Sequence, residues 1–310
     1  MEHGENGRRR IAFSAVLAAA LLVWLVAFLL PGGAKANWEK IFRFCGLGDY
    51  AAYADEAPLS VHILSVGKAD SILVESKDGS MLIDGGTAAS GGSVCAYLKK
   101  RGIRSLDFLV NTHPDSDHVG GLESVVRSFP VRRCLCPSLP KDLIPNTQEY
   151  TGFQSALQES GISAEHPKAG SVSRMGSLRV DVLGPVVPGK DANNNSIVLM
   201  LTFENTRFLL MGDAEAEEEA SLLSSGRDLK ADVLKVGHHG SSTSTTAAFL
   251  SAVRPRYAAI SVGNDSAALP RLDVSSRLAD IGAEVYRTDI SGTVIFLSDG
   301  KSIRVITENS

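Results

Sequence analysis

The chain has 310 residues, 44% of them hydrophobic, and carries a formal net charge of −4 at pH 7. This length and composition suit one large domain with a substantial core, alone or behind a leader segment. The sequence contains no repeat of about 20–50 residues, which argues against a solenoid. Acidic residues outnumber basic ones, so the chain lacks the basic footprint that is usual in nucleic-acid-binding proteins.

The first 36 residues are predicted to be a targeting segment. Arg8, Arg9 and Arg10 precede an uncharged run over residues 11–30, which is long enough to span a bilayer as one helix. The run exceeds the usual apolar core of a signal peptide, about 7–15 residues, although residues 34–36 offer a small-x-small cleavage site. We therefore favour a signal anchor over a cleaved signal peptide. The arginines predict a cytoplasmic N-terminus, with the rest of the chain outside the cytoplasm.

Residues 37–57 are interpreted as a linker and residues 58–310 as the main domain, in which short apolar runs alternate with helical stretches. Two strand-rich halves, each with helices, predict two sheets packed face to face with helices outside. The predicted fold class is α+β, a four-layer αββα sandwich preceded by one N-terminal hydrophobic helix. We expect strands at residues 61–66, 71–75, 81–84 and 106–110, and near Leu178, Ile197, Phe208, Ala258, Val285, Val294 and Ile303. We expect helices at residues 94–101, 122–129, 215–223 and 246–253.

The segment that says most about chemistry is residues 112–121, which read THPDSDHVGG. Two imidazoles and two carboxylates lie within six of its residues: His113, Asp115, Asp117 and His118. The segment follows an apolar strand, and its two glycines allow a tight turn into the next helix. A solvated turn or an N-cap cluster has a similar composition. Four ligand-type residues at this position favour a divalent-metal site instead.

The decapeptide resembles the His-x-[His/Asp]-x-Asp-His signature of the metallo-β-lactamase fold hydrolases. With Asp115 at the third motif position, it is most similar to the branch that contains the extracytoplasmic hydrolase domain of the competence DNA-uptake protein ComEC. The likeness runs from about residue 60 to the end of the chain and implies the metallo-β-lactamase fold. Further segments resemble that branch in order: SMLIDGG at 80–86, NNSIV at 194–198, FLLMGD at 208–213, KADVLKVGHHGSST at 230–243 and VYRTDISGTVIFLSDG at 285–300.

The ligand types and the resemblance imply two divalent metal ions, zinc or manganese. We expect His113 and Asp115 to hold one ion and Asp117 and His118 to hold the other, with Asp213 bridging them. Ions held by imidazole and carboxylate lower the pKa of a bound water towards about 7 and so provide hydroxide at neutral pH.

A second histidine motif, His238-His239, follows another apolar strand. One of these histidines is expected to complete the second metal site, and the other to orient the leaving group or a phosphate oxygen. We assign His238 to the metal and His239, together with Asp117, to catalysis, although the sequence does not separate the two histidines. Ser241 begins a run of hydroxyl residues that either contacts a phosphate or caps the next helix.

Asp84 is expected to orient a ligand imidazole, or simply to begin the turn before two glycines. The chain also departs from the branch pattern in three places. Residues 67–70 read GKAD where Gly-Gln-Gly-Asp is usual, which keeps Asp70 as a candidate behind the site or near substrate. Leu269 stands where the branch has a histidine, which puts the second ion or the activity in question. Gly184 and a proline end a strand without the histidine ligand found in many lactamase-fold enzymes, so the site is carboxylate-rich.

We therefore expect an exported metal-dependent hydrolase, a phosphodiesterase or nuclease that uses a metal-activated hydroxide. The resemblance implies a phosphodiester substrate, with DNA as the target, and the N-terminal helix implies contact with a membrane. Two alternatives stay open: a metallo-hydrolase of another ester or lactone, such as a phosphorylcholine ester, and a weakly active metal-binding surface protein. The single hydrophobic segment cannot form a ComEC-type channel, so the chain resembles a stand-alone form of the hydrolase domain. Its oligomeric state is left open.

Overall fold

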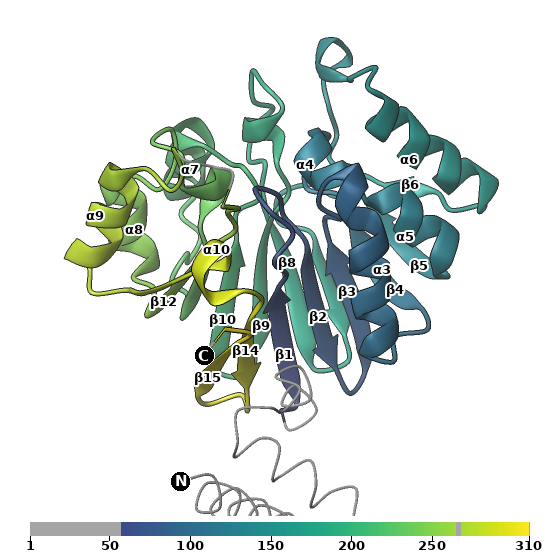
Figure 1. The fold of residues 1–310 in the computed structure, drawn as a ribbon. Coiled ribbons are helices and arrows are strands. Elements are labelled where there is room, and N and C mark those ends of the chain that lie inside the picture. Colours follow the sequence, from purple (N-terminus) through teal and green to yellow (C-terminus); the bar gives the residue numbers. More distant parts are fainter. Residues whose placement is uncertain (1–56, 265–267, 310) are drawn as a thin grey trace, which may run out of the picture. The chain divides into compact units, whose positions relative to one another are not determined.

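The computed structural model describes residues 57–264 and 268–309, which form two β-sheets with helices on their outer faces (Figure 1). The expected N-terminal helix, the targeting segment over residues 1–36 and nearly all of the linker over residues 37–57 lie outside the described residues. Within the described ranges, no helix combines the length and the apolar character needed to cross a bilayer.

The first sheet has eight strands and a mixed topology. In spatial order they are β15 (Ile303–Thr307), β14 (Val294–Ser298), β1 (Leu59–Ile63), β2 (Ile72–Ser76), β3 (Gly79–Ile83), β4 (Leu106–Val110), β5 (Val131–Leu135) and β6 (Ala164–Glu165). The strands from β15 to β3 pair antiparallel, whereas those from β3 to β6 pair parallel and need longer crossovers.

The second sheet has seven strands and the same mixed character. Strands β13 to β10 pair parallel, and β10 to β7 pair antiparallel. In spatial order they are β13 (Glu284–Arg287), β12 (Tyr257–Ile260), β11 (Val233–Lys235), β10 (Thr206–Leu210), β9 (Val198–Phe203), β8 (Leu178–Gly184) and β7 (Val172–Met175).

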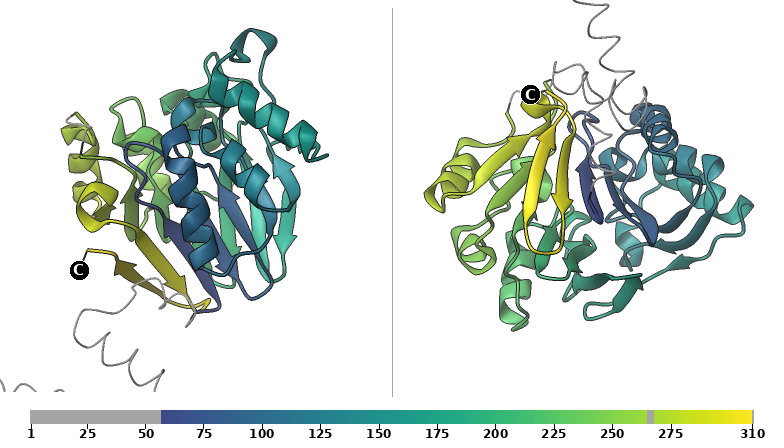
Figure 2. Two further views of the ribbon diagram at one scale, coloured as in Figure 1. Left: turned by 45° about the vertical axis from the view of Figure 1, so that its right-hand side comes forward. Right: turned by 90° about the horizontal axis from the view of Figure 1, so that it is seen from below.

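Three apolar clusters define the layers of the sandwich. Figure 2 shows the helices on the outer faces of the two sheets. The first lies between the sheets and combines residues such as Phe108 and Phe208. The second lies between the second sheet and α7 (Ala216–Ser224), α8 (Ala247–Val253) and α9 (Leu272–Asp280). The third lies between the first sheet and α3 (Gly91–Lys100), α5 (Leu122–Ser128) and α6 (Gln148–Glu159). The predicted α+β fold with two packed sheets is therefore confirmed, in four layers.

Most of the expected strands and helices are present, with boundaries shifted by one to three residues. Strands β5, β6 and β7 and helices α6 and α9 were not expected. Four short segments complete the description: α4 (Ser116–Val119), α10 (Thr288–Ser291) and the 3-10 turns η2 (Ala88–Ser90) and η3 (Lys141–Leu143). Two further 3-10 turns, η4 (Asn193–Asn195) and η5 (Gly237–Gly240), lie beside candidate site residues.

The fold brings the candidate residues together at one edge of the sandwich. Asp84 follows β3 and the decapeptide follows β4, which are parallel neighbours in the first sheet. Asp213 follows β10 and His238 follows β11, which are parallel neighbours in the second sheet. Because the carboxyl ends of parallel neighbours lie at the same edge of a sheet, each sheet delivers its polar loops to a common seam.

Candidate metal centre

Asp84 organises the decapeptide from behind. One carboxylate oxygen accepts a hydrogen bond from the Thr112 backbone N–H at 2.8 Å, and the other accepts from the Thr112 hydroxyl at 2.6 Å and from His118 Nδ1 at 2.8 Å. The side chain is fully buried, and its backbone has a φ of 58°. A non-glycine residue in this left-handed region costs about 1–3 kcal/mol and is typical of a functional site. The structure thus brings Asp84 to the imidazole that the sequence expected it to orient.

Three buried imidazoles present the same nitrogen to a common point. His118 donates through Nδ1 to Asp84, and His239 donates through Nδ1 to the Ser261 carbonyl at 2.9 Å. His113 Nδ1 lies 3.1 Å from the Thr112 hydroxyl, whose proton is already committed to Asp84, so the ring is the donor. These bonds assign the proton to Nδ1 in each ring. The Nε2 atoms are therefore the ones that face the site, as in metal-binding histidines.

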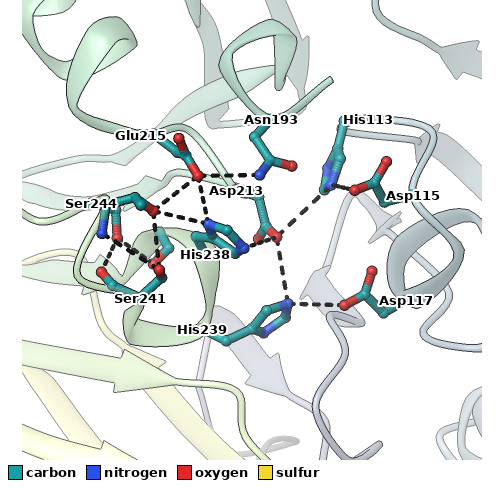
Figure 3. Close-up of polar contacts among 12 residues, drawn as sticks. His113, Asp115, Asp117, Asn193, Asp213, Glu215, His238, His239, Ser241 and Ser244 are labelled. Atoms are coloured by element: carbon teal, nitrogen blue, oxygen red, sulfur yellow. Dashed lines mark hydrogen bonds and ion pairs between the residues drawn. The ribbon is translucent and has the colours of Figure 1, made fainter. Parts of the chain in front are cut away.

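Asp213 lies among these rings, and Figure 3 shows it between His113, His238 and His239. Its carboxylate oxygens are 3.3 Å from His118 Nε2, 3.6 Å from His239 Nε2, and 3.9 Å from both His113 Nε2 and His238 Nε2. Its side chain is only 3% exposed. One carboxylate is therefore shared by four imidazoles, which is the position expected of a bridging ligand.

The two other carboxylates divide the cluster into two sides (Figure 3). Asp115 Oδ2 lies 3.8 Å from His113 Nε2, whereas Asp117 Oδ2 lies 3.5 Å from His239 Nε2. His118, His239 and Asp117 have ligand atoms close enough together to share one ion, as do His113, His118 and Asp213. His239 therefore lies with Asp117 and His118, and His238 lies on the other face of Asp213.

Electrostatics within the cluster favour the metal-binding forms of several groups. Burial, reinforced by the neighbouring His118, lowers the pKa of His113 to about 4, so this ring is neutral at pH 7. Burial opposes ionisation of Asp213, but His118 and His239 outweigh it and hold the pKa of that carboxyl well below its usual range. His118 is the exception: burial lowers its pKa, but Asp213 and Asp84 outweigh burial and raise that pKa, which favours the protonated ring.

The donor set passes a direct test of fit to a divalent ion. His113 Nε2 and Asp213 Oδ1 are buried and have no hydrogen-bond partner. An unsatisfied buried polar atom costs about 1–3 kcal/mol, and both atoms belong to a cluster of the imidazole and carboxylate groups that bind divalent ions. A cation would satisfy both atoms at once.

His238 is held by a network that the sequence did not predict (Figure 3). Glu215 Oε1 accepts from His238 Nδ1 at 2.8 Å, from the Thr243 hydroxyl at 2.9 Å and from Asn193 Nδ2 at 3.3 Å. His238 Nε2 is consequently turned towards Asp213. Glu215 lies two residues after Asp213 at the start of an acidic helix, where sequence alone indicates an ordinary N-terminal acid. Its spacing of two residues from Asp213 is the sequence feature that could have indicated its role in orienting His238.

Both residues of the His-His pair have left-handed backbones, with φ of 47° at His238 and 52° at His239. Two successive residues of this kind send their side chains in different directions. His239 is fully buried among the other rings, whereas the His238 side chain is 24% exposed. The backbone conformation thus separates two histidines that are identical in sequence.

Asp70 lies behind the cluster of candidate ligands, and Ser241 lies beside it. Asp70 forms a fully buried ion pair with Lys235 at 2.8 Å and lies 3.8 Å from His239 Nδ1. Its backbone N–H donates to the Asp117 carbonyl at 3.1 Å. The Ser241 hydroxyl oxygen is held within its own loop, where it accepts from the Thr243 backbone N–H at 3.4 Å. Asp70 is thus directly behind the ligands, and Ser241 is on the His238 side.

Leu269, the residue in place of the usual histidine, packs against the apolar cluster between the second sheet and its helices. The next residue, Pro270, abuts the His-His loop so closely that a Cβ atom on Gly240 would lie 2.7 Å from it. This segment therefore supports the loop through packing. The end of β8 at Gly184 contributes no side-chain ligand, as the sequence indicates.

Comparison with known proteins identifies the family of the chain. Residues 64–263 match the model of the metallo-beta-lactamase superfamily. The chain is 33% identical over 254 residues to ComE operon protein 3 of Bacillus subtilis (strain 168), which covers 76% of this chain and 32% of that protein. It is 32% identical over 286 residues to competence protein ComA of Neisseria gonorrhoeae, which covers 91% of this chain and 38% of that protein. The chain thus spans about a third of the length of these relatives.

A solved structure gives a fold-level match. The metallo-beta-lactamase fold protein YhfI of Bacillus subtilis aligns with a TM-score of 0.51 at 12% identity, over 74% of this chain and 96% of that one. At this identity the alignment supports the fold alone.

Proposed function

The chain belongs to the metallo-β-lactamase superfamily, and on that premise we propose that it is a metal-dependent phosphodiesterase that acts outside the cytoplasm. The observation that carries the proposal is the convergence of three buried Nε2 atoms on the Asp213 carboxylate, with two buried polar atoms left without partners. Metal binding explains this arrangement better than protein stability does, because stability alone would favour fully paired groups.

We assign the ions to two sides of Asp213. His113 and Asp115 would hold the first ion, Asp117 and His118 the second, and Asp213 would contact both. When bound, the ions supply Lewis-acid charge for a phosphoryl oxygen and lower the pKa of a water molecule towards about 7. A carboxylate-rich donor set of this kind suits manganese as well as zinc.

We propose that the two histidines of the His-His pair divide their roles in the reverse of the order that we assigned from sequence. His239 is buried beside Asp117 and His118 and would complete the second site. His238 is partly exposed and is oriented by Glu215. With Nδ1 fixed, His238 would hold a proton at Nε2 and deliver it to the leaving oxygen of the ester.

The proposed substrate class is based on the names of the relatives and on the number of carboxylates in the donor set. One relative is named a competence protein and the other a ComE operon protein, which favours DNA as the phosphodiester. The donor set has more carboxylates than the His-rich site usual for lactam hydrolysis. The N-terminal targeting segment predicted from sequence would place the site outside the cytoplasm, where external DNA is met.

The test is hydrolysis of bis-p-nitrophenyl phosphate by the full chain after removal of metal and re-addition of manganese or zinc. We expect turnover only with added metal, and none in His113→Ala. Bound metal without turnover of this ester or of single-stranded DNA would contradict the proposal and favour another ester or a non-catalytic role.

A further inference from the structure

Lys68 contacts the candidate metal centre at a ligand carboxylate. Its Nζ donates to Asp117 Oδ2 at 2.7 Å, on the same oxygen that lies 3.5 Å from His239 Nε2. Lys68 lies in the loop between β1 and β2, directly after Gly67, whose φ of +84° turns the chain there. This stretch departs from the pattern of the branch that the chain resembles, which usually has glutamine in place of Lys68.

Exposure shows which side of the cluster faces solvent. The side chains of His113, His118 and His239 are 0% exposed, whereas those of Asp115 and Lys68 are 48% and 39% exposed. Asp115 and Lys68 therefore lie on the side from which a substrate reaches the centre. Lys235, the other lysine paired with a carboxylate here among the described residues, is fully buried and cannot meet a substrate.

We propose that Lys68 is a substrate-binding residue that contacts a non-bridging oxygen of an anionic ester and gives this chain a preference for charged over neutral esters. The inference rests on the proposed function and deepens it. An ammonium group is a compact point charge with three donors on a flexible stem. It can keep one hydrogen bond to Asp117 while another N–H reaches an incoming phosphate oxygen.

A competing explanation makes Lys68 purely structural, a clamp that holds Asp117 in place for the metal. The two explanations predict opposite effects on metal affinity. A cation at 2.7 Å from a ligand oxygen opposes a second cation on the same oxygen, so removal of a substrate-binding lysine strengthens metal binding. Removal of a clamp releases Asp117 and weakens metal binding.

The experiment compares the full-length wild type with Lys68→Gln, which restores the usual residue, and with Lys68→Arg, which keeps the charge. Lys77→Gln is the matched control, because Lys77 is an exposed lysine in the β2–β3 turn. Three quantities are measured: the Kd for Mn²⁺ of the metal-stripped protein, the Kd for inorganic phosphate of the Mn²⁺-loaded protein, and KM for bis-p-nitrophenyl phosphate and for the neutral triester paraoxon.

We expect Lys68→Gln to weaken phosphate binding and raise KM for the anionic ester by about tenfold, with no change for paraoxon. We expect the same variant to bind Mn²⁺ about three- to tenfold more tightly. Lys68→Arg and Lys77→Gln should match the wild type in phosphate affinity. Unchanged phosphate affinity in Lys68→Gln, or weaker Mn²⁺ binding, would overturn the inference. If the wild type hydrolyses neither ester, the proposed function fails, while the two binding measurements still decide the role of Lys68.

Discussion

The orientation and the tautomer of each histidine in the centre depend on the partner of its Nδ1 atom. Asp84 binds His118 directly and reaches His113 through the Thr112 hydroxyl, so one buried carboxylate sets the orientation of two rings. The motif in the sequence identifies the rings, but the partner comes from the end of a different strand. Neither the orientation of the rings nor their tautomers could be predicted before the strands were paired.

Asp84→Asn is expected to weaken Mn²⁺ binding by about 10–100-fold, because loss of a carboxylate behind a ligand imidazole typically has an effect of this size. The fold should persist, since asparagine keeps an acceptor for the Thr112 backbone. Competition with a metal-sensitive dye measures the Kd. Asp280→Asn, which changes an exposed carboxylate, is the control. Equal Mn²⁺ affinity in Asp84→Asn and wild type would show that Asp84 merely begins a turn.

The two histidines of the His-His pair should respond differently to substitution. His239→Ala is expected to lose one equivalent of metal, because His239 Nε2 lies among Asp117, His118 and Asp213. His238→Ala should keep both equivalents and lose about 10²–10⁴-fold in kcat, the range typical of a proton donor. Metal content by elemental analysis, together with kcat for bis-p-nitrophenyl phosphate, separates these outcomes. Loss of metal in His238→Ala alone would restore the assignment made from sequence.

At the scale of elements, helix α7 anchors the loops around the site through buried acids. Glu218 accepts from the Val186 backbone N–H at 2.9 Å, and Glu219 accepts from the Thr246 N–H at 2.9 Å. Burial of Glu218 raises the pKa of its carboxyl from 4.5 to about 7. The folded protein therefore holds this proton more tightly than the unfolded chain does between pH 4.5 and 7.

This raised pKa predicts a pH dependence of stability with a definite sign. Since the folded state binds more protons in this window, the free energy of unfolding falls as pH rises from 4.5 to 7 and stays lower above pH 7. Glu218→Gln should remove this pH dependence. Its free energy of unfolding should exceed that of the wild type by about 1–3 kcal/mol at pH 8 and differ little at pH 4. Urea denaturation at both pH values measures it, and Asp142→Asn is the exposed control. Equal stability of the two proteins at pH 8 would contradict the shift.

Polar residues interrupt two of the elements that the sequence did not predict, β5 and α6. Strand β5 reads VRRCL, and its two arginines break the apolar run on which strand prediction relies. Helix α6 buries only Phe153, Ala156 and Leu157, and its remaining residues are mostly polar. By contrast β4 reads LDFLV, is almost entirely apolar and was predicted. Packing against the first sheet supplies the stabilisation of α6 that its local sequence lacks.

At the scale of the whole molecule, the centre lies at the seam between two sheets built from distant parts of the chain. The first sheet supplies His113, Asp115, Asp117 and His118, and the second supplies Asp213 and the His-His pair. The family resemblance anticipated this meeting, whereas composition and periodicity predicted only two packed sheets. The buried ion pair between Asp70 and Lys235 crosses the same seam, since Asp70 follows β1 and Lys235 ends β11.

Breaking that ion pair should destabilise the molecule as a whole. Lys235→Met leaves the Asp70 carboxylate buried and unpaired, which typically costs about 3–5 kcal/mol. The double variant Asp70→Asn/Lys235→Met should lose less than the sum of the single variants, because no charge is left without a partner. Lys230→Met, at an exposed lysine close by in the chain, is the control. Chemical denaturation measures the free energy of unfolding of the two single variants, the double variant and the control. Additive losses in the two single variants and the double variant would show that Asp70 and Lys235 do not depend on each other.

The central claim, that this seam is a two-ion phosphodiesterase centre, is tested most directly by one titration. Mn²⁺ is added stepwise to the metal-stripped full chain, and bound metal and cleavage of single-stranded DNA are followed in the same sample. We predict that cleavage rises as the second equivalent binds, and that Asp213→Asn loses both the second equivalent and the cleavage. Cleavage without bound metal, or cleavage that survives in Asp213→Asn, would contradict the account.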